Sequence, residues 1–132
     1  MKKIMVVDDD NDLVETLNFY LSYSDYLVLT ANSISKMFEM LDTDKPDVIL
    51  LDIMLPDMDG ISACKKLKED TVLSLIPVMM ITAKDRREDV ESAIKAGADA
   101  YVSKPFSLPR LVERIEELLS RRNIALRGKS SS

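Results

Sequence analysis

Short apolar runs alternate along the chain with longer stretches that carry apolar residues at helical spacing. The runs lie at residues 4–7, 27–30, 48–51 and 78–81, with a weaker one at 100–102. Most are apolar at successive positions and rich in Val and Ile, which is typical of strands buried on both faces. The helical stripes lie within residues 13–21, 34–41, 61–67, 90–94 and 108–119. This alternation predicts five β-α repeats and an α/β fold with a parallel sheet covered on both faces.

Residues that favour helix ends agree with the pattern of stripes. Asn11, Ser33 and Ser107 are placed to cap the first, second and fifth helices. Gly97 follows the fourth stripe and is expected to end that helix. For Asp10, a role in favouring the dipole of the first helix is as plausible as a role in chemistry.

The length of 132 residues fits one domain. We expect a folded domain over residues 1–122 and a disordered polar tail over residues 123–132, which ends in three serines. No apolar run approaches the roughly 18 residues needed to cross a membrane, and nothing at the N-terminus resembles a signal peptide. We therefore expect a cytoplasmic protein.

Charge and composition restrict the possible chemistry. The net charge of −5 is a poor match for nucleic-acid binding, which needs a basic surface. The chain contains no histidine, which excludes a Ser-His-Asp triad and a histidine-ligated zinc site within it. The single cysteine, Cys64, cannot form an internal disulfide and suits a reducing compartment. Carboxylates, hydroxyls, lysine and a hard metal ion remain as candidates for chemistry.

Polar residues follow the predicted strands at the sheet edge where open α/β folds bind ligands. Asp8 and Asp9 follow the first strand, Asp52 the third, Thr82 the fourth and Lys104 the fifth. Two carboxylates about 4 Å apart repel by about 4 kcal/mol at an effective dielectric constant near 20, so they need a positive partner. Lys104 can supply one charge, and Mg²⁺ or Mn²⁺ can supply two more. Such a set suits phosphoryl transfer to a carboxylate nucleophile.

At these residues the chain resembles the receiver domain of two-component response regulators over its whole predicted fold. Four segments in the right order carry the resemblance: Val6-Val7-Asp8-Asp9, Leu51-Asp52-Ile53-Met54-Leu55-Pro56-Asp57-Met58-Asp59-Gly60, Ile81-Thr82-Ala83, and Gly97-Ala98-Asp99-Ala100-Tyr101-Val102-Ser103-Lys104-Pro105-Phe106. The resemblance implies a flavodoxin-like, doubly wound sheet of five parallel strands in the order 2-1-3-4-5, with five helices. It also implies a signalling switch rather than an enzyme, one that assists its own phosphotransfer and dephosphorylation.

The resemblance assigns roles to the acidic residues. Asp52 is then the phosphorylation site and is also expected to be a ligand of a Mg²⁺ or Mn²⁺ ion. Asp9 is expected to bind the ion directly and Asp8 mainly through water. Met54 is expected to contribute only its backbone carbonyl to the metal.

Further residues take roles from the resemblance. Lys104 would bind the phosphoryl group, and the Lys104-Pro105 bond is expected to be cis. Thr82 is the switch hydroxyl that moves toward the phosphoryl group, and Tyr101 turns inward behind it. The surface formed by the fourth helix, the fifth strand and the fifth helix is then expected to change. Pro56 and Gly60 are expected to shape the loop after the third strand.

The resemblance also implies partners. A sensor histidine kinase or phosphotransfer protein would donate the phosphoryl group, and output would pass to a downstream protein, without direct nucleic-acid or membrane binding. Arg114 fits the charged network through which many receivers dimerise, but Ala100 and Arg110 stand where acidic residues are expected. We therefore expect a monomer or a weak phosphorylation-dependent dimer.

Three other classes of protein share part of this pattern. A carboxylate-nucleophile phosphatase of the dehalogenase type needs a second acid two residues after Asp52, where Met54 stands. A flavodoxin-like FMN binder needs a hydroxyl- or glycine-rich loop after the first strand, where three aspartates would repel the phosphate. A receiver-like interaction module that is never phosphorylated has the same fold, and an assay must separate it from the switch.

Overall fold

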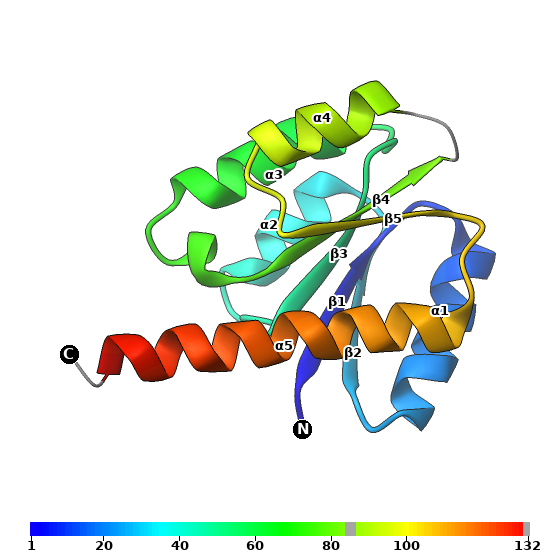
Figure 1. Ribbon diagram of the computed structural model, residues 1–132. Coiled ribbons are helices and arrows are strands. Elements are labelled where there is room, and N and C mark those ends of the chain that lie inside the picture. The colour runs from blue at the N-terminus through cyan, green and yellow to red at the C-terminus, as the bar shows by residue number, and fades with distance from the viewer. Residues whose placement is uncertain (84–86, 131–132) are drawn as a thin grey trace.

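The computed structural model describes residues 1–83 and 87–130, with side chains described as far as residue 122. Strands and helices alternate along these residues as the apolar pattern predicts (Figure 1). In chain order the elements are β1 (Lys3–Val7), α1 (Asn11–Tyr23), β2 (Leu27–Ala31), α2 (Ile34–Leu41), β3 (Val48–Asp52), α3 (Gly60–Glu69), a 3-10 turn η1 (Leu73–Leu75), β4 (Val78–Ala83), α4 (Arg87–Lys95), β5 (Ala100–Lys104) and α5 (Leu108–Ser130).

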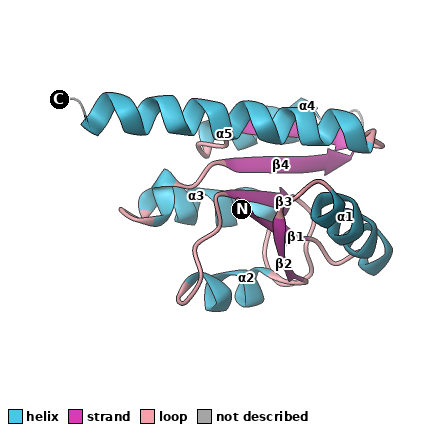
Figure 2. Cartoon of the chain, turned by 90° about the horizontal axis from the view of Figure 1, so that it is seen from below, coloured by secondary structure: helices cyan, strands magenta, loops and turns pink. Residues whose placement is uncertain are grey.

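The five strands form one parallel sheet in the order β2-β1-β3-β4-β5. The strands turn progressively across the sheet in the view from below (Figure 2), as parallel sheets ordinarily do. The α/β class, the strand order and the five α-helices are therefore confirmed. The register places Val7 beside Leu51 and Asp52 beside Ile81, so the strands that carry the candidate site end close together.

Two hydrophobic cores lie on opposite faces of the sheet, and alternate strand residues feed each of them. On β3, Ile49 and Leu51 face the core with α2, α3 and α4, while Val48 and Leu50 face the core with α1 and α5. Figure 1 shows the same division, with α2, α3 and α4 on one side of the sheet and α1 and α5 on the other. Because both faces are covered, the inner strands β1, β3 and β4 have no polar face, which explains their continuous apolar runs.

Most of the predicted helix ends are confirmed, and one is wrong. Ser33 Oγ accepts a hydrogen bond from Lys36 N at 3.1 Å, Ser107 Oγ accepts one from Arg110 N at 3.3 Å, and Gly97 follows α4 with φ of 97°. For α1, however, the N-cap is Asp10, whose carboxylate accepts from Leu13 N at 3.2 Å. Asn11 is the first helical residue, because the extended backbone of Asp10 already turns its side chain onto the helix end.

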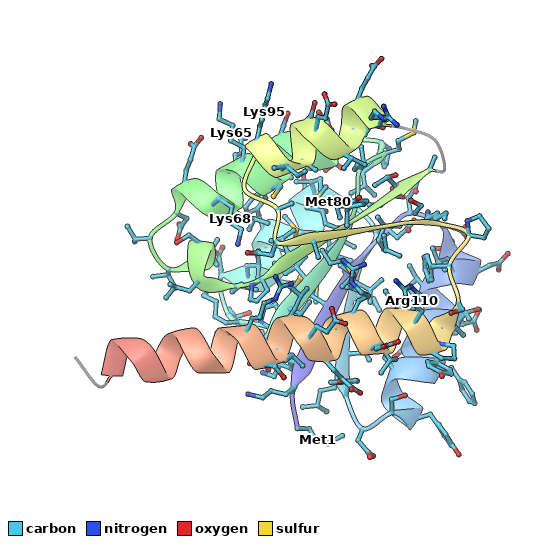
Figure 3. The ribbon with its side chains drawn as sticks, in the orientation of Figure 1. Met1, Lys65, Lys68, Met80, Lys95 and Arg110 are labelled. Carbon is cyan, nitrogen blue, oxygen red and sulfur yellow. The ribbon has the colours of Figure 1, made fainter. Side chains whose placement is uncertain are left out.

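The stripe predicted for α4 is corrected in its orientation. Ile94 is 61% exposed, and Ala93 is the buried residue of this helix. A small alanine lets α4 lie close to the sheet, and Ile94 then projects away from the core. Lys95 also points outward from α4, whereas Met80 lies within the fold (Figure 3).

Helix α5 extends beyond residue 122, the predicted end of the domain. The bounds of α5 include residues 123–130, which the sequence assigns to a disordered tail, and residues 131 and 132 lie outside the described residues. The domain boundary at residue 122 stays a prediction. In the described ranges, none of the helices combines the length and apolar character needed to span a membrane.

Candidate functional site

The candidate site lies at the carboxyl edge of the sheet, where three strands deliver charged residues. Asp8 directly follows β1, Asp52 is the last residue of β3 and Lys104 is the last residue of β5. Each side chain is held by a strand whose preceding residues are fixed in a hydrophobic core. Rigid strands place reacting groups more accurately than free loops do.

Three carboxylates meet at this edge. Asp8, Asp9 and Asp52 each present an oxygen, and these oxygens all lie within 4.8 Å of one another. Asp8 is fully buried and Asp52 is 7% exposed, whereas Asp9 is exposed. Backbone N–H groups hold the two buried carboxylates: Asp10 N donates to Asp8 Oδ1 at 2.9 Å and Met54 N donates to Asp52 Oδ1 at 3.1 Å.

Lys104 supplies positive charge between the two buried carboxylates. Its Nζ lies 3.2 Å from Asp8 Oδ2 and 3.5 Å from Asp52 Oδ2. Burial raises the pKa of Asp52 to about 6, with the charge of Asp8 as the second cause. Burial acts to lower the pKa of Lys104, but attraction by Asp52 and Asp8 raises it overall. One ammonium group thus leaves the carboxylates under-compensated, and a further cation would favour the ionised form of Asp52.

The donor set fits a hard divalent cation. Carboxylate oxygens with backbone carbonyls and water are the ligands that Mg²⁺ and Mn²⁺ prefer. Met54 adjoins the carboxylates through its backbone, while its side chain is 62% exposed. The role of the Met54 carbonyl as a metal ligand stays a prediction.

The two predicted switch residues lie on the neighbouring strands. Thr82 is buried near the end of β4, and its hydroxyl donates to the Ala83 carbonyl at 2.8 Å. Tyr101 is 41% exposed on β5, in register with Met80 of β4. The Lys104-Pro105 bond between β5 and α5 is cis, as predicted.

The loop that joins β3 to α3 contains a contact that the sequence did not predict. Asp57 accepts hydrogen bonds at the N-terminus of α2, from Ile34 N at 3.0 Å and Ser35 N at 2.9 Å. These hydrogen bonds lower the pKa of Asp57. The only signal in the sequence is that the first backbone N–H groups of any helix need acceptors, which does not identify the residue that supplies them.

The raised pKa of Asp52 predicts a pH-dependent effect on stability. The pKa of Asp52 is 3.8 in the unfolded chain and about 6 in the folded chain. Between pH 3.8 and about pH 6, the folded chain therefore holds a proton at Asp52 that the unfolded chain has lost. The contribution of Asp52 to the free energy of unfolding therefore falls as pH rises through this window. Without metal at pH 7.5, Asp52→Asn should raise the free energy of unfolding by about 1–2 kcal/mol, which is less than the full shift implies because water screens part of it.

This effect can be measured by urea unfolding of both proteins with a chelator present. The advantage of Asp52→Asn should shrink as the pH falls toward 4, where the wild-type carboxyl becomes neutral. A difference that stays constant with pH would contradict the shift.

Comparisons with known families agree with this geometry. The model of the response regulator receiver domain family matches residues 4–116. The chain is 41% identical over 124 residues to the alkaline phosphatase synthesis transcriptional regulatory protein PhoP of Bacillus subtilis, covering 94% of this chain and 51% of that protein. It is 38% identical over 119 residues to the response regulator MprA of Mycobacterium leprae, covering 90% and 51% respectively. The chain thus spans about half the length of the curated relatives it matches.

Solved structures give the same result. A response regulator receiver domain protein (CheY-like) from Methanospirillum hungatei superposes with a TM-score of 0.89 at 28% identity, covering 95% of this chain and 98% of that one. NtrX from Brucella abortus, solved in complex with ADP, superposes with a TM-score of 0.93 at 27% identity, covering 100% of this chain and 30% of that one.

Proposed function

The chain belongs to the receiver-domain family of response regulators, a signalling module rather than a conventional enzyme, and on this premise we propose that it is a switch phosphorylated on Asp52. The observation that carries the proposal is the convergence of Asp8, Asp9 and Asp52 within 4.8 Å, with Lys104 beside two of them. A phosphatase of the dehalogenase type would need an acid at residue 54, which is a methionine. An FMN binder would need an uncharged phosphate-binding loop after β1, where three aspartates stand.

Asp52 is the nucleophile of the proposed reaction. With a pKa of about 6, its carboxylate is mainly ionised at neutral pH. Met54 N holds Oδ1 by a hydrogen bond, and Oδ2 lies on the side of Lys104. A carboxylate oxygen of Asp52 forms a bond to phosphorus while the bond between phosphorus and the leaving group of the donor breaks, which gives an acyl phosphate. In a histidine kinase or phosphotransfer protein, that leaving group is an imidazole nitrogen.

The neighbours of Asp52 bind and neutralise the transferred group. Lys104 meets one phosphoryl oxygen, and the Thr82 hydroxyl meets another after leaving the Ala83 carbonyl. Asp8, Asp9, Asp52 and the Met54 carbonyl would hold the metal. Mg²⁺ or Mn²⁺, when bound, supplies the positive charge that phosphoryl transfer needs.

The output is a change in the surface formed by α4, β5 and α5. A pocket of about 280 Å³ on this surface is lined by Ile94, Tyr101 and Arg114, among others. Ile94 and Tyr101 are exposed apolar residues in a position to contact a protein partner. Movement of Thr82 and Tyr101 on phosphorylation would alter this surface and so control binding of a downstream protein in the cytoplasm.

Incubation with a small phosphodonor tests the proposal. With acetyl phosphate and Mg²⁺, the intact mass of the wild-type chain should increase by one phosphoryl group. Addition of a chelator before the donor should prevent the gain, because the carboxylates then remain uncompensated. Absence of a gain with Mg²⁺ would overturn the proposal and favour an interaction module that is never phosphorylated.

A further inference from the structure

The β3–α3 loop, residues 53–59, is closed at its base by backbone contacts. Met54 and Asp59 form an isolated antiparallel bridge, and Gly60 N donates to the Ile53 carbonyl at 2.8 Å. Asp59 then caps α3 by accepting from Ile61 N at 2.9 Å. These contacts join the base of the loop to β3 and α3. Residues 55–58 form the rest of the loop.

Asp57 links the rest of the loop to α2. Both of its carboxylate oxygens accept backbone hydrogen bonds, one from Ile34 N and the other from Ser35 N. The same contacts lower the pKa of the carboxyl, so it stays ionised at neutral pH, where it also complements the positive end of α2. Ser33 accepts from Lys36 N instead, so the two residues satisfy different groups at one helix end.

We propose that Asp57 is a positioning residue for the phosphorylation site, which it serves by anchoring the β3–α3 loop to the N-terminus of α2. This inference rests on the proposed function, because the positioned group is the Met54 backbone, whose carbonyl is the expected metal ligand. The Met54 side chain is 62% exposed and gives its residue little packing support. Leu55 and Met58 are partly buried and pack against the core. The hydrogen bonds of Asp57 add to this non-directional packing a directional link to α2.

A shift of the loop would affect Asp52 through Met54. Met54 N donates to Asp52 Oδ1, so a shift of the loop moves both the carbonyl offered to the metal and the donor that orients the nucleophile. Residues that position a metal ligand without touching the metal lower the metal affinity when they are removed. Asp57 is exposed and touches α2 rather than the carboxylates themselves, so its effect acts through the loop.

Magnesium affinity measured by titration calorimetry tests the proposal. Asp57→Ala should weaken Mg²⁺ binding about tenfold, at the lower end of the range for groups that support metal ligands. Asp57→Asn keeps one oxygen acceptor and should fall between Asp57→Ala and wild type. In the metal-free protein, amide hydrogen exchange at Met54 and Gly60 should be faster in Asp57→Ala than in wild type.

Two matched variants separate positioning from loss of helix capping. Ser33→Ala removes the other cap of α2, and Asp70→Ala removes a carboxylate that accepts from Val72 N and Leu73 N, both at 2.9 Å, outside the candidate site. Both should leave Mg²⁺ affinity within about twofold of wild type. If Asp57→Ala binds Mg²⁺ as wild type does, or if Ser33→Ala weakens it equally, the positioning role is overturned. If the wild-type chain itself binds no Mg²⁺, the proposed function falls and the inference falls with it.

Discussion

Asp52→Asn should abolish the phosphodonor-dependent gain in mass at neutral pH with Mg²⁺. The amide oxygen of asparagine is uncharged and a poor nucleophile, so the bond to phosphorus does not form at a measurable rate. The substitution is nearly isosteric, and the side chain can still accept from Met54 N. The fold should therefore persist, and its stability without metal should increase as argued from the raised pKa of Asp52.

Asp10→Asn is the matched control for this experiment. Asp10 is an exposed aspartate next to the acidic pair, and its side chain caps α1. Asparagine caps helices about as well as aspartate, so this variant should keep both its fold and its phosphorylation. Intact mass spectrometry over a time course compares the three proteins. An undiminished gain in Asp52→Asn would show that Asp52 is not the acceptor.

Gly60→Ala should reduce the free energy of unfolding by about 2–4 kcal/mol, which is the cost of forcing a group into tightly packed surroundings. A Cβ at Gly60 would lie 2.2 Å from the backbone oxygen of Asp52 and 2.8 Å from Cα of Ile53. Both atoms belong to the main chain at the end of β3, so no side chain can rotate away. Relief requires α3 to move from β3, which would also displace Asp52.

Gly97→Ala is the comparison variant for Gly60→Ala, and urea unfolding measures both. At Gly97 the added Cβ would meet Lys68 Cγ at 3.0 Å, at a flexible side chain. The main cost there is the positive φ of 97°, worth about 1–2 kcal/mol for a residue with a side chain. Gly97→Ala should therefore lose less stability and keep its phosphorylation, whereas Gly60→Ala should lose both. Equal losses in the two variants would contradict the close-approach argument.

The fold could be predicted largely because burial on both faces leaves a strong pattern. Strand residues such as 48–51 must be apolar at every position when helices cover both sides, and the sequence has that character. The order of the strands came from the resemblance, since the alternation of strands and helices is compatible with more than one parallel order. The orientation of α4 was missed because two apolar residues do not define a face, and Ala93 carries too small a signal.

The principal site residues could be predicted because their positions follow from topology. Asp8, Asp52 and Lys104 stand at strand ends, and parallel strands bring their carboxyl ends to one edge. Asp57 could not be predicted in the same way. Its partners lie 22 and 23 positions away, and the contact depends on the conformation of a loop. The choice of Asp10 over Asn11 as cap was missed because both types favour this role, and the backbone conformation decides between them.

Cys64 lies fully buried on α3 and faces the core shared with α2 and α4. Burial raises the pKa of its thiol to about 11, so the reactive thiolate is scarce while the helix is docked. The single thiol of the chain is thus a built-in reporter of opening. A thiol-reactive dye would record how often α3 leaves the sheet, and α3 begins at Gly60, eight positions after the proposed acceptor. The rate of Cys64 labelling with and without Mg²⁺ would then show whether metal binding at the sheet edge changes how often α3 opens.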